Sequence, residues 1–323
     1  QALAAQKEPY RIFCNSAMNF VKEEKFFAST EGSRIEQTIV RSWPSFTVTA
    51  ADKQTGKFQS RESFTEPMGM GYEFVADSPL IVDARKAAED AMAKHKGKPV
   101  TPGKRDLVLA PSNLWLTIHE SVGHSTELDR ALLWEADYAG TSFLTPDKTG
   151  KLQFGSKICN FFADRTQPQG LATVAYDDEG VPGQRWYLVK DGIFVDWQTT
   201  RDLAPLIGQK KSYGCLHADS WGSVPFPRMP NVSLEPAPVD ARLDDLVSGV
   251  DDGILIYGNG SWSIDQQRYN FQFTGQVFYE IRGGKIGQML EDVAYQSNTQ
   301  EFWNACTAMC DERGWRMGGS FFR

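Results

Sequence analysis

Cysteine is scarce in this chain, and its few copies do not form a disulfide pattern. The 323 residues include five cysteines, an odd number at irregular spacings: Cys14, Cys159, Cys215, Cys306 and Cys310. A secreted domain held together by disulfide bonds usually carries an even and denser set. We therefore exclude a disulfide framework and favour a reducing compartment.

Long apolar runs and an excess of basic residues are also absent. No stretch of about 18 apolar residues occurs, so the sequence predicts no membrane-spanning segment and no membrane partner. The chain has 34 Lys and Arg against 41 Asp and Glu, a formal net charge of −7. Binding through nucleic-acid phosphates needs clustered cationic side chains, so we expect no nucleic-acid partner.

Short runs of alternating apolar and polar residues dominate the sequence. Residues 33–42 and 45–50 alternate in this way and are separated by brief breaks, which is typical of antiparallel strands. Helices are expected over residues 84–96, 243–250 and 300–313. The sequence predicts an α+β fold, mostly antiparallel β-sheet, with a barrel-like C-terminal domain.

A polar segment that contains Pro and Gly, residues 96–104, divides the chain into two parts. Such segments are common between domains. We predict that residues 1–104 belong to an N-terminal or middle α+β domain. Residues 105–323 then form a β-rich C-terminal domain that carries the chemistry described next.

The strongest chemical signal is a pair of histidines that flank a glutamate. The sequence reads His119-Glu120-Ser121-Val122-Gly123-His124, within a helix expected from Leu114 to about Trp134. Five residues of regular α-helix rotate by roughly 140°, which would splay the two imidazoles. A π-bulge lengthens the local repeat and returns both rings to one face. Gly123 stands where this distortion is sterically easy, so we predict a kinked metal-binding helix.

Zinc is the metal that suits this motif, because it takes nitrogen ligands and lowers the pKa of a bound water to about 7. His119 and His124 are the predicted ligands, and Glu120 is the predicted general base. Glu127 and Asp129 follow on the next turn, where either could orient a histidine. The alternative is that two packed or surface histidines flank a glutamate by chance, and the spacing alone does not decide.

A catalytic zinc usually has three protein ligands, and the sequence offers several weak candidates for the third. They are Glu127, Cys215, His217, Cys306 and Cys310. Cys306 and Cys310 would share a face of the helix expected over residues 300–313. The simpler interpretation of these two cysteines is a pair of small buried apolar side chains.

Two segments have the composition of a substrate-binding edge. Residues 228–236 form an extended, proline-punctuated stretch, and residues 260–273 are dense in polar and aromatic groups. Either could hold an extended peptide by main-chain hydrogen bonds, and either could be ordinary sheet and turn. Arg228, Asn231 and Ser233 are the candidate substrate-binding side chains.

Several of these blocks together resemble the TldD/PmbA family of peptidases. The resemblance covers roughly residues 106–323 and includes the His-Glu pair with Glu127 and Asp129, residues 176–180, residues 228–236 and Gly318-Gly319. It implies a cytoplasmic zinc metallopeptidase with one zinc per chain, similar to the catalytic subunit of the family. It also implies a homodimer or a heterodimer with a related subunit. The implied substrates are unfolded or modified peptides, bound as an extended strand in an enclosed chamber.

The chain departs from the family pattern at both ends. The family's third zinc ligand is a cysteine near the C-terminus, and no residue here matches it. A long N-terminal region of the family is also missing, so we expect a chain truncated at both ends. The alternative function is a non-catalytic peptide-binding or partner subunit. Nothing in the charge pattern supports a gyrase-binding module.

Overall fold

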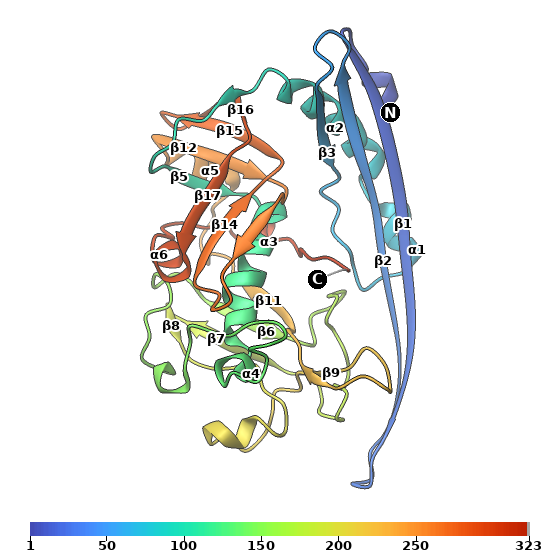
Figure 1. Ribbon diagram of the computed structural model, residues 1–323, viewed down its shortest axis with the longest axis vertical. Helices are drawn as coiled ribbons and strands as arrows, with labels where there is room; N and C mark the ends of the chain where they lie inside the picture. The colour runs from blue at the N-terminus through green and yellow to red at the C-terminus, as the bar shows by residue number, and fades with distance from the viewer. Residues whose placement is uncertain (322–323) are drawn as a thin grey trace.

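The computed structural model describes residues 1–321, and its N-terminal part is built on a long β-hairpin (Figure 1). Strands β1 (Tyr10–Ala28) and β2 (Arg34–Asp52) pair in antiparallel register from Tyr10 opposite Asp52 to Ala28 opposite Arg34. Strand β3 (Phe58–Glu62) extends the sheet beside β2. The remaining elements of this part are a 3-10 turn and two helices: η1 (Leu3–Ala5), α1 (Tyr72–Asp77) and α2 (Leu80–Lys94). We call the β1–β2 hairpin the arm.

Only the base of the arm belongs to a hydrophobic core. The alternation along β2 places Phe46, Val48 and Ala50 on one face, where they pack against the alanine-rich face of α2. Small alanine side chains let a helix lie close to a sheet, and Ala87, Ala88 and Ala91 are buried there. Arg61 of β3 holds α2 through two contacts of 2.7 Å to the carboxylate of Asp83. Beyond this base the arm continues along the rest of the molecule (Figure 1).

The C-terminal part contains four small sheets. The five-stranded sheet has the order β4 (Lys98–Pro99), β16 (Lys285–Glu291), β15 (Val277–Arg282), β12 (Asp252–Tyr257) and β5 (Asp106–Leu109). A four-stranded sheet has the order β11 (Asn231–Leu234), β6 (Phe161–Asp164), β7 (Arg185–Lys190) and β8 (Ile193–Phe194). The others are β13 (Trp262–Ile264), β14 (Asn270–Thr274) and β17 (Ala294–Asn298), and the pair β9 (Leu216–His217) and β10 (Phe226–Pro227).

The helices of the C-terminal part are short, and the one that starts with α3 lies between two cores. Leu116 of α3 packs into the core of the five- and three-stranded sheets, whereas Ile118 and Val122 pack into a core that includes Phe161 and Trp303. Burial on both sides fixes this helical segment in the molecule. The α-helices are α3 (Pro111–Ile118), α4 (Leu128–Ala131), α5 (Leu243–Ser248) and α6 (Thr299–Asn304). Outside the segment between α3 and α4, the 3-10 turns of the described residues are η4 (Pro146–Lys148), η5 (Ala204–Ile207) and η6 (Glu312–Gly314).

The predicted α+β class with mostly antiparallel strands is confirmed. Within residues 1–321 only two strand pairs are parallel, β12 with β5 and β16 with β4. The barrel-like C-terminal domain is not found: every sheet of the described residues has a linear strand order and two open edges. The strands there are too short and too often interrupted by turns to continue around a closed ring.

Two helix predictions were too long. The helix expected over residues 300–313 ends at Asn304, and Cys306 and Cys310 lie in an extended tail, so they do not share a helix face. The helix expected to run to Trp134 is interrupted at Glu127, whose backbone is extended (φ −73°, ψ 118°). In both places tertiary contacts override local helix propensity. Phe322 and Arg323, at the end of the predicted C-terminal domain, lie outside the described residues.

Candidate metal centre

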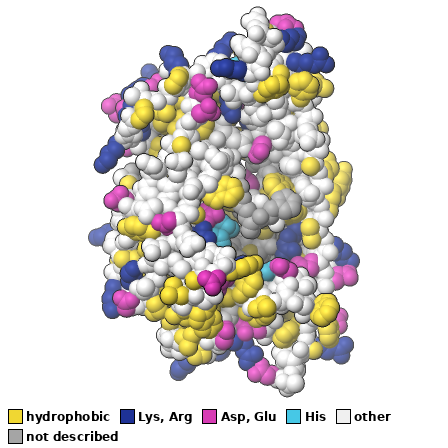
Figure 2. Space-filling view, viewed as in Figure 1, with side chains coloured by type: hydrophobic (Ala, Val, Ile, Leu, Met, Phe, Trp, Pro, Cys, Tyr) yellow, Lys and Arg dark blue, Asp and Glu magenta, His cyan; other side chains and the backbone are white. Residues whose placement is uncertain are grey.

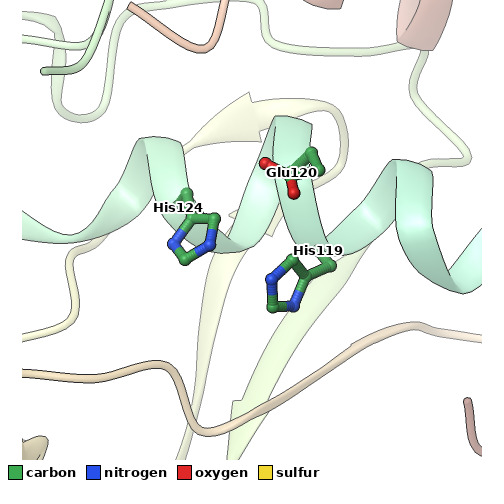
Figure 3. A group of neighbouring side chains, drawn as sticks. All are labelled: His119, Glu120 and His124. Carbon is green, nitrogen blue, oxygen red and sulfur yellow. The ribbon is translucent and has the colours of Figure 1, made fainter. Parts of the chain in front are cut away.

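The His119–Glu120–His124 group lies on a distorted helix, as the spacing predicted. Helix α3 continues into a π-helical turn, η2 (His119–Gly123), and then into a 3-10 turn, η3 (His124–Thr126). Both imidazole rings project from the same side of this segment (Figure 3). Their centroids are 4.5 Å apart at an interplanar angle of 79°. One ligand atom from each of His119, Glu120 and His124 lies within 4.8 Å of the others.

The reason for glycine at position 123 differs from the prediction. Gly123 has ordinary helical angles (φ −55°, ψ −62°), so any residue could adopt its backbone. The space beside it is filled by Met229, from the segment that precedes β11. A Cβ at position 123 would lie 2.3 Å from Sδ and 2.4 Å from Cε of Met229. Glycine therefore allows close packing at this position.

His124 is a neutral imidazole, and one of its two nitrogens forms a hydrogen bond with a carboxylate. Its Nδ1 lies 2.8 Å from Oε2 of Glu127, which is fully buried and forms an ion pair with Arg130. Because a carboxylate oxygen accepts hydrogen bonds, Nδ1 carries the ring proton and Nε2 keeps its lone pair. Burial lowers the pKa of His124 well below its usual value, and the nearby charges of Arg130, Arg268 and Arg228 lower it further. A neutral histidine oriented by a carboxylate is the usual form of a metal ligand.

Glu120 is buried beside the histidines and forms an ion pair that the sequence analysis missed. Nη1 of Arg268 donates to Oε2 of Glu120 at 2.9 Å. Nη2 of Arg268 donates to the carbonyl of Ala139 at 2.7 Å, and Arg130 donates to the same carbonyl at 2.6 Å. Arg268 lies in the turn between β13 and β14, within the polar segment 260–273. The polar composition of this segment was the only sign in the sequence that it could belong to the site. It did not identify Arg268 as the partner of Glu120.

Asp129 does not contact a histidine but belongs to a neighbouring group of carboxylates. It lies against Glu135, and both side chains are buried. Burial raises the pKa of Asp129 to about 9, helped by the hydrogen bond with Glu135 and by the charges of Glu127 and Glu135. Ionisation of Asp129 is costly because its carboxyl group is buried next to other carboxylates. Glu135 also accepts from Nη1 of Arg228 at 2.8 Å, and this ion pair was not predicted either.

The candidate substrate residues line one wall of a large cavity, with different roles. The Arg228 guanidinium lies 3.7 Å from the Phe226 ring centroid and is paired with Glu135. Asn231 is used for internal structure: its side chain accepts from the amide of Ala172 and donates to the carbonyl of Asp164. Ser233 lies on β11, opposite Phe162 of β6. Of the three, Arg228 is the one that lies in the charged network beside the histidines.

The cavity has a volume of about 3100 Å³ and separates the arm from the body of the molecule. The arm contributes Val21, Glu23 and Arg41, and the body contributes His119, His124 and residues 228–236. The C-terminal tail contributes residues 305–310 and 313–321. Figure 2 shows the hollow on this face, with histidine side chains at its edge. The tail passes next to α3, since a Cβ on Gly318 would lie 2.3 Å from Cβ of Trp115.

The far end of the arm is attached to the body on the other side of this cavity. Gln37 exchanges two hydrogen bonds of 3.0 Å with the backbone of Tyr176. Lys25 forms an ion pair with Asp178 at 2.6 Å, and Arg201 forms one with Glu31 at 2.7 Å. The turn over residues 176–180, noted in the sequence as part of a family block, therefore holds the arm. Because the arm is attached to the body here, it forms one wall of the cavity.

Of the other candidate ligands, Glu127 contacts His124 through a hydrogen bond, whereas Cys215, His217, Cys306 and Cys310 do not belong to the histidine group. Among residues 1–321, His119, Glu120 and His124 form the group close enough to hold one metal ion. Cys215 is buried, and this burial raises the pKa of its thiol to about 12. Nδ1 of His217 lies 3.5 Å from Oδ2 of Asp178. The donor set of two imidazoles and one carboxylate suits zinc(II), with His119 and His124 as the nitrogen donors. No helix in the described part of the chain is long and apolar enough to cross a membrane.

The chain is similar to known proteins that are described as metalloproteases. The chain is 29% identical over 274 residues to a metalloprotease of Methanocaldococcus jannaschii, covering 83% of this chain and 56% of the relative. It is 27% identical over 227 residues to the zinc metalloprotease TldD homolog of Saccharolobus solfataricus, covering 69% of this chain and 47% of that protein. The chain thus spans about half the length of these relatives.

A solved structure has the same fold, and a family model shows the family. The structure of TldE from Thermococcus kodakarensis has the same fold, with a TM-score of 0.74 at 17% identity over 92% of this chain and 63% of that one. Residues 102–321 match the model described as the PmbA/TldA metallopeptidase C-terminal domain. The chain therefore belongs to the PmbA/TldD metallopeptidase family.

Proposed function

We propose that this chain is the catalytic part of a zinc-dependent peptidase, with His119 and His124 as metal ligands and Glu120 as general base. The observation that carries the proposal is the convergence of ligand atoms from these three side chains within 4.8 Å, where both histidines line a large cavity. The neutral state of His124 and its hydrogen bond to Glu127 support a ligand role. The proposal agrees with the relatives described as metalloproteases.

The residues of the chain divide the work in the following way. Zinc, when bound, supplies a Lewis acid that polarises the peptide carbonyl and acidifies water. Glu120 takes the proton from the attacking water and passes it to the leaving amine. Glu127 keeps the His124 ring in the tautomer that has its lone pair on Nε2. Arg130 balances the buried charge of Glu127.

We propose that the substrate is an unfolded or modified peptide bound as an added β-strand. In the described residues, β11 and β17 are edge strands of their sheets, and residues of both line the cavity. An edge strand has main-chain N–H and C=O groups that are not paired within the sheet. An extended peptide can form hydrogen bonds with these groups whatever its own sequence. The arm on the opposite side would restrict entry to extended chains.

We further propose that the protein pairs with a second copy or with a related subunit. The arm exposes large apolar side chains, including Met18 (55% exposed), Phe20 (50%) and Phe26 (63%). Such side chains gathered on one element favour an interface. Light scattering should report a dimer, and Phe20→Ser with Phe26→Ser should weaken it; a wild-type monomer at micromolar concentration would contradict this proposal.

The decisive experiment compares zinc content and cleavage in three proteins. Wild type should hold about one zinc per chain and cleave an unfolded polypeptide in a chelator-sensitive way. Glu120→Gln should keep zinc and lose cleavage, whereas His119→Ala should lose both. Glu89→Gln, an exposed glutamate of α2, and His217→Ala are the matched controls, and both should retain zinc.

The outcomes separate the two candidate functions. Cleavage that persists in Glu120→Gln and is still chelator-sensitive would rule out the role of Glu120. A wild-type protein that binds peptides but takes up no zinc would be a non-catalytic peptide-binding subunit.

A further inference from the structure

Arg268 occupies a backbone conformation that is unfavourable for its residue type. Its φ is 61°, in the left-handed region that favours glycine, at the turn between β13 and β14. The turn is held from several sides: the amide of Arg268 donates to the carbonyl of Asp265, and the carbonyl of Arg268 accepts from Oγ1 of Thr299. The carboxylate of Asp265 accepts from the amides of Tyr269 and Asn270. Strain that the surrounding structure maintains is often associated with function.

The strained turn delivers the guanidinium to the proposed general base. Nη1 of Arg268 lies 2.9 Å from Oε2 of Glu120, and Nη2 lies 2.7 Å from the carbonyl of Ala139. Two anchors on different nitrogens fix the plane of the guanidinium. Glu120 is 6% exposed and the Arg268 side chain 15%, so water screens this ion pair little.

The arrangement is costly if its only purpose is charge balance. Arg130 donates to the same Ala139 carbonyl, so two guanidinium groups converge on one oxygen beside the histidines. Arg130 is already paired with Glu127, and Arg268 meets Glu120 from a separate sheet. Each of the two carboxylates beside the histidines, Glu127 and Glu120, therefore has its own arginine.

We propose that Arg268 is a positioning residue, which holds the Glu120 carboxylate in the orientation that a general base needs beside His119 and His124. This inference rests on the proposed peptidase function. Arg268 engages one carboxylate oxygen and limits rotation of the group about its last side-chain torsion. A misplacement of about 1 Å in a reacting group can cost about a hundredfold in rate.

The test uses the zinc-loaded protein and four variants. Arg268→Gln removes the charge, Arg268→Lys keeps it without the planar fork, and Arg268→Gly also relieves the left-handed backbone. Arg282→Gln is the matched control, since Arg282 forms an exposed ion pair with Asp252 on β12. Each protein is measured for zinc content, melting temperature, kcat and KM on an unfolded peptide, and the Kd of acetohydroxamate. This small ligand binds zinc and hydrogen-bonds to a neighbouring carboxylate, so its affinity reports the placement of Glu120 without turnover.

We expect Arg268→Gln to retain zinc, to lose about 10- to 100-fold in kcat with KM little changed, and to bind acetohydroxamate about tenfold more weakly. Arg268→Lys should recover part of both losses. Arg268→Gly should show the same losses as Arg268→Gln without a lower melting temperature. Arg282→Gln should match wild type.

Four results would contradict the inference about Arg268, the peptidase proposal or both. Wild-type kcat and acetohydroxamate affinity in Arg268→Gln would show that Arg268 does not position Glu120, while the peptidase proposal would stand. Loss of zinc in all three Arg268 variants would show a structural role instead. A wild type that binds zinc and acetohydroxamate but cleaves no peptide would end the peptidase proposal, and the acetohydroxamate affinities would still decide the role of Arg268. A wild type that takes up no zinc would end both.

Discussion

The Met229 side chain lies directly against Gly123, one residue before the second histidine of the motif. A Cβ at position 123 would come within 2.3 Å of the Met229 sulfur. This contact joins the helical metal motif to the segment that precedes β11, which lines the cavity. The two segments are more than a hundred residues apart in the chain. The Met229 side chain nevertheless limits the size of the residue that position 123 can hold.

The contact between Gly123 and Met229 predicts a change of sign in a double-mutant cycle. Gly123→Ala alone should destabilise the fold by about 1 kcal/mol, because the clash outweighs the better helix propensity of alanine. In a Met229→Ala background the same change should stabilise, because the space is free. Urea unfolding of the four proteins measures both effects. Destabilisation of equal size in both backgrounds would show that Met229 is not the cause.

The hydrogen bond from His124 to Glu127 predicts an effect on metal affinity. Glu127→Gln should weaken zinc binding about 10- to 100-fold, because the ring loses an ionised partner that orients it and raises its basicity. Competition against a chromophoric chelator measures the affinity. Glu120→Gln serves as the comparison and should bind zinc almost as tightly as wild type. An unchanged affinity in Glu127→Gln would show that the contact does not support the ligand.

The raised pKa of Asp129 predicts a pH-dependent stability. The pKa of Asp129 in the folded protein, about 9, lies above its unfolded value near 4, so between these pH values the unfolded chain binds fewer protons. Stability is therefore lost as pH rises through this window. Asp129→Asn has no proton to release at this position. Its free energy of unfolding should therefore rise relative to that of wild type between pH 5 and pH 9, by up to about 1.4 kcal/mol per pH unit. Parallel stability curves for the two proteins would contradict the raised pKa of Asp129.

The cysteines should differ sharply in reactivity. Cys14 is exposed on the arm, whereas Cys159 and Cys215 are buried, and burial raises the pKa of the Cys215 thiol to about 12. Thiol titration of the native protein should show a fast phase from Cys14, and Cys14→Ser should remove that phase. Cys215 should react only after unfolding, because a buried thiol at high pKa forms little thiolate. Fast labelling of Cys215 in the native state would contradict its burial.

The features that could be predicted from the sequence are local ones. The five-residue spacing of His119 and His124 requires an i to i+5 repeat to bring both rings to one face, so the π-helical turn follows from the motif alone. Alternation along residues 33–42 and 45–50 likewise predicted strand, since a strand places successive side chains on opposite faces. The break expected between these two runs is absent, because β2 continues from Arg34 to Asp52. The position of Glu127 beside His124 was among the predicted possibilities because only three residues separate them.

The other parts of the site depend on the path of the chain. Arg268 meets Glu120 across 148 positions, and Arg228 meets Glu135 across 93, so no local pattern could pair them. Gly123 was assigned to backbone freedom because its neighbour Met229 arrives from a distant segment. The cavity itself exists because the arm leaves its own core and attaches to the turn at residues 176–180. The grouping of His119, Glu120 and His124 and the helical distortion beneath it follow from local sequence, because both depend on the geometry of one helix. The counter-ions, the packing and the enclosure of the group follow from the tertiary fold, because they depend on which distant segments pack against that helix.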